Sequence, residues 1–131
     1  MARAVALLLI VSRSALADSS SVRPVINPRQ LHDDALLHLR RRDIGSAKAV
    51  LAGLETSAPN HGFTQLLRGH CAWLADGDMD LAEEIYDEAR ASFSASSDHD
   101  ATAEALHAIG RLCRQQNRWP EADAHYAAAL A

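Results

Sequence analysis

Histidine and cysteine are the side chains in this sequence that could bind a metal or carry acid–base chemistry. There are seven histidines and two cysteines. A metal site brings such residues together at short spacings, as in C-x-x-C or H-E-x-x-H. Neither motif occurs, and His32 and His38 are too far apart to share a helix face at i, i+4. We therefore expect no metal site and no other cofactor.

The same residues do not assemble into a catalytic set. His99 lies between Asp98 and Asp100 in a polar segment, a pattern typical of a solvated loop. The sequence contains no G-x-S-x-G nucleophile motif and no G-x-x-x-x-G-K-[ST] phosphate loop. Because no nucleophile, base and orienting group occur at a recognisable spacing, we predict that the protein is not an enzyme.

Composition favours a helical domain without strands. The chain has 131 residues, of which 48% are hydrophobic and only 5% aromatic, and alanine and leucine supply most of the apolar content. That mixture favours helices packed closely through small side chains. The formal charge of -4 is spread along the chain. Since binding to a nucleic-acid backbone needs a concentrated basic face, we do not expect a nucleic-acid partner.

Residues 1–17 are predicted to be a secretory signal peptide. Arg3 supplies positive charge, Ala4–Val11 is a continuous apolar run of eight residues, and Ala15-Leu16-Ala17 fits a small-x-small cleavage site. We expect cleavage after Ala17 and a periplasmic or secreted protein from a bacterial-type cell. The run is far shorter than the roughly 20 residues that a membrane helix needs. We therefore expect no stable membrane span after signal removal.

An alternative interpretation places the protein in the cytoplasm. Arg13, between the apolar run and the cleavage site, is untypical of a signal peptide. It fits an ordinary N-terminal helix or an upstream start codon. The next segment, residues 18–28, is rich in serine and contains two prolines, so it is predicted to be a linker.

Residues 29–131 divide into three helical pairs, at about 29–62, 63–97 and 101–131. Each pair consists of two amphipathic segments separated by a short polar turn. An alanine lies early in each second segment, at Ala47, Ala82 and Ala122, with separations of 35 and 40 residues. Sixteen residues before each alanine lies a leucine, at Leu31, Leu66 and Leu106. The matching offsets predict three copies of one structural unit.

The first segment of the third pair reads Leu106-x-x-Ile109-Gly110-x-x-Cys113. It resembles the first-helix signature of the tetratricopeptide repeat, a helix–turn–helix unit of about 34 residues. The second pair matches as Leu66-x-x-Gly69-His70-x-x-Trp73, with His70 in the place of the usual small residue, and the first pair matches more weakly. The resemblance implies an all-α fold, a right-handed α-solenoid of three such repeats over residues 29–131.

The resemblance also implies a protein–protein interaction module that binds a peptide or protein in a concave groove. The first helices would line this groove, at His32, Leu36, Leu39, Arg40, Leu67, Cys71, Leu74, His107, Arg111 and Arg114. The first two repeats would supply an apolar strip and the third a basic patch, which suits a peptide with apolar side chains and an acidic end. His32, Leu36 and Glu104 occupy three sites where the carboxylate-clamp subfamily has other residues, so its chaperone-tail ligand is not implied.

The two cysteines also take positions in this repeat frame. Cys113 replaces the tyrosine of the signature and is expected in the core, whereas Cys71 is expected on the inner face. A disulfide would be allowed in an exported protein, but it needs Cα atoms within about 7 Å of each other. The two cysteines are offset by two residues between adjacent repeats, which favours two free thiols over a disulfide but leaves both alternatives open.

About three repeats are needed for a stable stack, and terminal repeats usually have a polar cap. The sequence shows no such cap after the last predicted helix. We expect the chain to be a fragment, or a partner or a second copy of the chain to cover that helix in a homo-oligomer. Two alternatives to an exported binding module remain: a cytosolic regulatory segment of a larger signalling protein, and an accessory domain of an enzyme.

Overall fold

The computed structural model describes residues 26–131, and its described part is built from helices alone. They are α1 (Pro28–Arg40), α2 (Ile44–Ser57), α3 (Gly62–His70) with its continuation η2 (Cys71–Ala75), α4 (Met79–Ala95), α5 (His99–Gln115) and α6 (Trp119–Leu130). No strand occurs in this span. The prediction of an all-α repeat fold is confirmed. The predicted signal peptide and most of the predicted linker lie outside the described residues.

Short polar side chains begin most of the helices. The side-chain oxygens of Asn27, Asp43, Asp78 and Asp98 each accept a hydrogen bond from a backbone N–H three residues further on. This contact satisfies a donor that has no partner within the helix. Asp98, in the polar segment around His99, is therefore the N-cap of α5. These caps fix where each amphipathic segment begins and therefore which face it presents.

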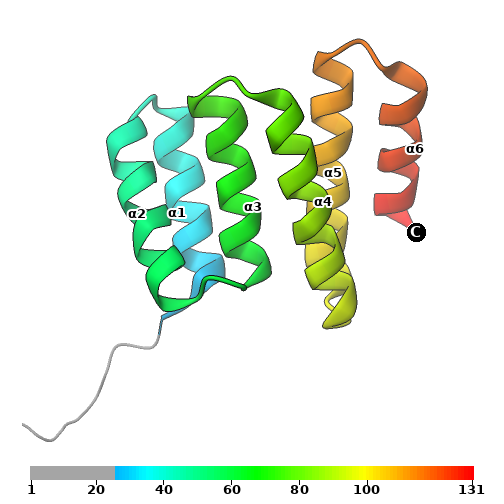
Figure 1. Cartoon of the computed structure of the whole chain (residues 1–131). Coiled ribbons are helices and arrows are strands. Elements are labelled where there is room, and N and C mark those ends of the chain that lie inside the picture. The colour runs from blue at the N-terminus through cyan, green and yellow to red at the C-terminus, as the bar shows by residue number, and fades with distance from the viewer. Residues whose placement is uncertain (1–25) are drawn as a thin grey trace, which may run out of the picture.

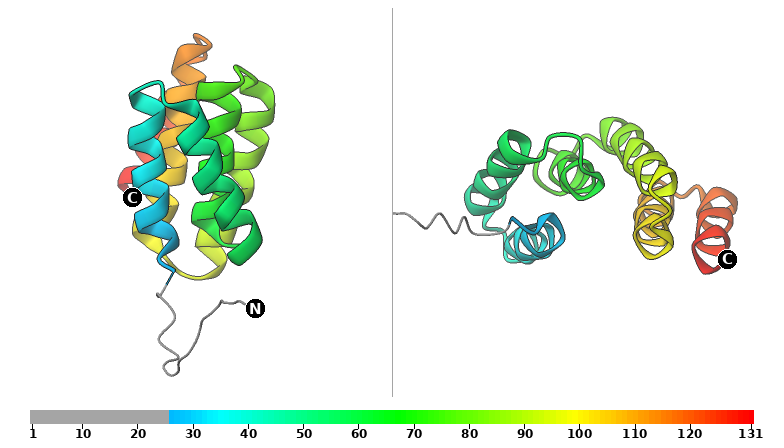
Figure 2. Two further views of the ribbon diagram at one scale, coloured as in Figure 1. Left: turned by 90° about the vertical axis from the view of Figure 1, so that its left-hand side faces the viewer. Right: turned by 90° about the horizontal axis from the view of Figure 1, so that it is seen from below.

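The turns inside the three pairs have the same backbone geometry. Arg42, Gly77 and Asn117 adopt left-handed conformations with φ of 63°, 70° and 62°. Their separations of 35 and 40 residues equal those of the three buried alanines, which are 0%, 0% and 1% exposed at Ala47, Ala82 and Ala122. The three pairs are therefore copies of one unit. Figures 1 and 2 show the pairs succeeding one another along a curved path.

The interior divides into two hydrophobic clusters. The first joins α1 and α2 to Leu67 and Cys71 of the second repeat. The second contains the buried residues of α4, α5 and α6 together with Phe63 and Leu66 of α3. The first helix of the second repeat therefore contributes to both clusters and links the first repeat to the others.

Within the second and third pairs, a tyrosine ring of the second helix packs directly on a glycine of the first. A Cβ added to Gly69 would lie 2.6 Å from Tyr86 Cδ1, and one added to Gly110 would lie 2.7 Å from Tyr126 Cε1. No side chain larger than hydrogen fits these positions without movement of the ring. Gly110, the small residue of the first-helix signature, therefore lets α5 and α6 approach closely.

The predicted register of the second repeat is wrong by one residue. His70 was matched to Gly110, but Gly69 occupies the equivalent place against a tyrosine. The cause is the π-helical turn at Cys71–Ala75, which holds one additional residue. The backbone hydrogen bonds that close the three turns show this additional residue. The N–H groups of Asp43 and Arg118 donate to carbonyls five residues earlier, whereas the N–H of Asp78 donates to the carbonyl of Ala72, six residues earlier.

Replacing Gly69 by alanine is expected to destabilise the protein, because Tyr86 is fully buried and cannot move aside. Overpacking of this kind costs about 1–3 kcal/mol. Gly53→Ala is the matched control, since Gly53 lies in α2 with nothing within 4 Å of the added Cβ. That change should stabilise by about 0.5–1 kcal/mol through helix propensity. Urea unfolding midpoints measure both, and equal effects of the two changes would contradict the packing described.

Candidate functional site

Equivalent residues of the three first helices line one cleft of about 150 Å³. Its lining comprises His32, Leu36, Arg40, Leu66, His70, Glu104, His107, Ala108 and Arg111. His32, Leu66 and His107 form one layer, and Leu36, His70 and Arg111 form the next, with separations of 34 and 41 residues in both layers. The repeat thus places three helices around one cleft, and the two layers differ in the types of their side chains.

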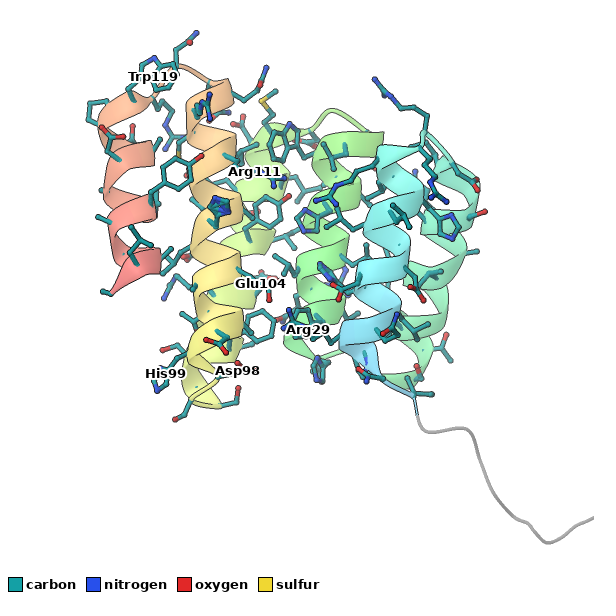
Figure 3. The ribbon with its side chains drawn as sticks, turned by 180° about the vertical axis from the view of Figure 1, so that it is seen from behind. Arg29, Asp98, His99, Glu104, Arg111 and Trp119 are labelled. Atoms are coloured by element: carbon teal, nitrogen blue, oxygen red, sulfur yellow. The ribbon has the colours of Figure 1, made fainter. Side chains whose placement is uncertain are left out.

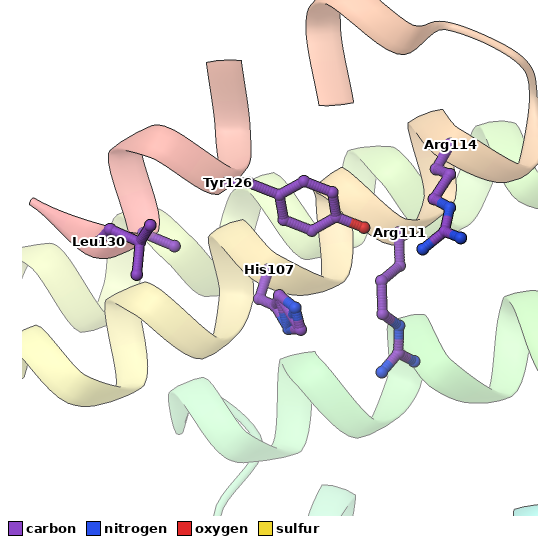
Figure 4. A pocket seen from close by; sticks show the side chains of 6 residues that line it. His107, Arg111, Arg114, Tyr126 and Leu130 are labelled. Atoms are coloured by element: carbon purple, nitrogen blue, oxygen red, sulfur yellow. The ribbon is translucent and has the colours of Figure 1, made fainter. Parts of the chain in front are cut away.

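A larger pocket of about 440 Å³ adjoins the cleft between α5 and α6. His107 and Arg111 line both hollows, and the pocket is completed by Arg114, Tyr126, Ala129 and Leu130. Figure 4 shows the phenol ring of Tyr126 and the side chain of Leu130 beside His107 and the two arginines. We call the cleft and the pocket together the inner surface.

An ion pair spans the cleft near the N-terminal ends of α1 and α5. Arg29 Nη2 lies 2.7 Å from Glu104 Oε2, and the Arg29 guanidinium lies 5.1 Å from the centroid of the Phe63 ring on α3. Figure 3 shows Arg29 and Glu104 facing each other from the two helices. Arg29, Phe63 and Glu104 are equivalent positions of the three repeats. They form a layer of their own beside the His32 layer, and their mutual contacts close that end of the cleft.

The arginines at the other end of the cleft have no such partner. Among residues 26–131, Arg40, Arg111 and Arg114 form no ion pair within 4.0 Å. Two of them lie over indole rings. The guanidinium carbon of Arg111 is 5.8 Å from the centroid of the Trp73 ring, and that of Arg114 is 5.9 Å from the centroid of the Trp119 ring. These stacking contacts orient the guanidinium groups without neutralising them. The inner surface is therefore cationic.

Arg118 shows the contrasting arrangement. Its guanidinium contacts both carboxylate oxygens of Glu83, at 2.7 and 3.1 Å, and also bonds Glu121. The hydrogen bond from Arg118 lowers the pKa of Glu121. This arginine ties the α5–α6 turn to α4, and its donors are committed to the fold.

Two histidines of the cleft are buried and electrically neutral. His32 is 2% exposed and His70 is 4% exposed, and their ring centroids are 5.3 Å apart. Burial lowers the pKa of His32, although its hydrogen bond to Asp33 opposes the shift. Burial lowers the pKa of His70 further, and nearby His32, Arg111 and Arg40 act in the same direction.

The structure brings together six of the ten predicted groove residues. His32, Leu36, Arg40, His107 and Arg111 line the cleft, and Arg114 lines the adjoining pocket. The remaining four, Leu39, Leu67, Cys71 and Leu74, belong to the hydrophobic cluster between the first two repeats and do not line the inner surface. For Leu67 and Cys71 the cause is the one-residue register error, which rotates a helical position by about 100°.

Several lining residues were not predicted as groove residues. Leu66 and His70 take the places expected for Leu67 and Cys71, and the π-helical turn that causes this has no recognisable signal in the sequence. Tyr126 and Leu130 come from a second helix, whereas the prediction considered only first helices. Their exposure depends on how α6 packs on α5, which periodicity does not specify.

Cys71 and Cys113 are both free thiols and both buried, in separate clusters. Burial raises the pKa of Cys71 to about 11 and also raises that of Cys113. The core position predicted for Cys113 is confirmed, and the inner-face position predicted for Cys71 is wrong. Both thiols are unreactive packing groups at neutral pH.

No group of three or more His, Cys, Asp or Glu side chains in residues 26–131 is arranged to hold a metal ion. No helix in that span has the length and apolar character needed to cross a membrane.

Comparison with known proteins identifies the repeat. The family model described as tetratricopeptide repeat matches residues 63–131, which is more than half of the chain. No curated protein and no solved structure shows a significant match to the chain. The matched span covers α3 to α6, where glycine–tyrosine contacts join the helices of each pair. The chain therefore belongs to the tetratricopeptide repeat family.

Proposed function

We propose that the inner surface binds a segment of a partner protein in which acidic groups lie beside apolar side chains. Tetratricopeptide repeats are protein–protein interaction modules and generally non-catalytic scaffolds. The observation that carries the proposal is the gathering of Arg40, Arg111 and Arg114 at one end of a cleft, with no ion pair among the described residues. Carboxylates are the groups that such arginines bind best, through paired N–H···O hydrogen bonds.

The apolar part of the inner surface defines the rest of the ligand. Leu36 and Leu66 lie in the cleft, and Tyr126 and Leu130 lie in the adjoining pocket, where Leu130 is 90% exposed. The cleft of about 150 Å³ is smaller than the roughly 300–1,000 Å³ of small-molecule sites. It suits one side chain of a protein partner. The closed layer at Arg29 and Glu104 directs the acidic group toward the opposite end.

The double change R111A/R114A is expected to weaken binding of acidic–apolar peptides at least about tenfold, because each charge-assisted hydrogen bond contributes roughly 1.5–3 kcal/mol. A set of fluorescent peptides, each with one leucine or phenylalanine flanked by zero to three glutamates, is titrated by fluorescence anisotropy. The affinity of the peptides for the wild-type protein should rise with the number of glutamates in the peptide.

The control is R68A/R90A, which removes the same charge. Arg68 and Arg90 pair with Glu55 and Asp87 and line neither the cleft nor the pocket. This variant should bind as the wild type does. Equal affinities of R111A/R114A and the wild type for the best peptide would overturn the proposal.

The proposal includes export of the protein before it meets its partner. Its support is the sequence of residues 1–17, with Arg3, the apolar run Ala4–Val11 and the site Ala15-Leu16-Ala17. A mature chain beginning at Asp18 is expected in the periplasmic or secreted fraction of a bacterial-type cell.

Cell fractionation followed by N-terminal sequencing checks this expectation. The variant L8D, which interrupts the apolar run, should accumulate uncleaved in the cytoplasm because translocation depends on that run. A wild-type chain that stays cytoplasmic and retains residues 1–17 would contradict export and leave the binding proposal intact.

A further inference from the structure

The contact between the first repeat and the rest of the protein contains a pair of buried imidazoles. The His32 ring lies 5.2 Å from the Phe63 ring and 5.3 Å from the His70 ring, and His70 lies 5.2 Å from Tyr86. These rings come from α1, α3 and α4, and they form a continuous row of tilted and edge-on contacts across the two repeats. Phe63 and Tyr86 belong to the second of the two hydrophobic clusters described above, so both imidazoles lie against that cluster.

The hydrogen bonding of His32 accommodates the neutral ring alone. Nδ1 lies 2.9 Å from Asp33 Oδ1, and because a carboxylate can only accept, Nδ1 carries the proton. Nε2 is buried and has no hydrogen-bond partner among the described residues. Protonation would convert Nε2 into a buried N–H with no acceptor, which is unfavourable because a buried donor without a partner loses its hydrogen bond to water.

His70 has the same preference for a different reason. Its Nδ1 lies 2.8 Å from the hydroxyl oxygen of Tyr86, which is itself fully buried. A neutral imidazole can accept the tyrosine proton at Nδ1, whereas an imidazolium can only donate there. Protonation at Nδ1 would therefore require the Tyr86 hydroxyl to reverse its hydrogen bond inside the core.

The charged groups around the pair oppose a second positive charge. His32 faces Asp33 and Arg29 of its own helix and Glu104 of α5. Arg40 of α1 and Arg111 of α5 act on His70, together with His32 itself, and all three disfavour its protonation. Two carboxylates, those of Asp33 and Glu104, thus favour protonation of His32, and no carboxylate has this effect on His70. Proton uptake at the first ring makes uptake at the second harder while both remain packed.

We propose that the His32–His70 contact is a proton-sensitive joint, which holds α1 against α3 when both rings are neutral and opens in mildly acidic solution. Opening lets each imidazolium reach water and separates the first repeat from the second. Because both histidines also line the cleft, the inner surface changes shape when the joint opens. The cluster of the second and third repeats includes no residue of α1 or α2, so its packing does not depend directly on the joint.

The direction of the pH effect follows from the lowered pKa values of the packed rings. An unpacked imidazole has a pKa of 6.5, so the open form binds protons more readily than the packed form. The stability of the contact is fully present above pH 6.5 and is lost as the pH falls below it, toward the lowered pKa values of the packed rings. Each proton taken up on opening favours the open form by up to about tenfold per pH unit.

The test follows the wild-type protein from pH 8 to pH 5, a range in which exposed carboxylates stay mostly ionised. Amide hydrogen exchange, corrected for its intrinsic pH dependence, should show protection in α1 and the first turns of α3 falling at least about tenfold between pH 7 and pH 5. Protection in α5 should fall much less. Uniform loss of protection over all helices, or no loss in α1, would overturn the proposal.

Variants test whether the fall in α1 protection comes from protonation of His32 and His70. In H32N/H70N the amides keep a donor toward Asp33 and an acceptor toward Tyr86 but do not titrate, so the fall in α1 protection should disappear. H99Q is the control, because His99 is exposed at the start of α5 and should leave the fall unchanged. Should the double variant not fold, the imidazole NMR resonances of the wild type decide. His32 and His70 resonances that titrate near pH 6.5 with no change in protection would refute the joint.

Discussion

The structure depends on the direct contact between a ring on one helix and the bare backbone of the other. In the second and third pairs Tyr86 lies on Gly69 and Tyr126 lies on Gly110. Since the ring touches backbone with no side chain between, its width sets the separation of the two helices. Each pair then has a fixed shape, and the buried alanine on the facing helix completes the fit. Successive repeats can stack regularly only because this shape recurs.

The recurring shape explains the inner surface. Each first helix presents two residues, four apart, to the cleft, and the stack brings equivalent residues of three repeats into one layer. The fold specifies where these side chains lie, and the sequence is free to vary what they are. The arginines divide accordingly: Arg68, Arg90 and Arg118 are held in ion pairs, whereas Arg111 and Arg114 rest on indole rings. The first group serves the fold, and the second group keeps its charge available.

The junction between the first and second repeats differs from the other contacts in its polarity. Leucine or phenylalanine in place of His32 and His70 would need no hydrogen-bond partner. The imidazole of His32 instead buries its Nε2 atom without a hydrogen-bond partner among the described residues. The first repeat also forms its own cluster, to which the second repeat adds Leu67 and Cys71, with Leu74 and Ala75 packed against it. The contact therefore combines an apolar cluster with two imidazoles, and it borders the surface that we propose for binding.

The sequence by itself determined the repeat, the helix pairs and their turns, because amphipathic periodicity, N-caps and small residues at fixed offsets are local properties. It also placed Arg111, Arg114 and His107 on the inner surface, since the third repeat follows the signature without interruption. Only the tertiary structure decided the register of the second repeat. One extra residue can be absorbed anywhere along a helix, and packing of Gly69 on Tyr86 forces it into the turn at Cys71–Ala75. That choice buried Leu67 and Cys71, brought Leu66 and His70 to the cleft, and set two histidines from different helices in contact, a proximity that no spacing along the chain encodes.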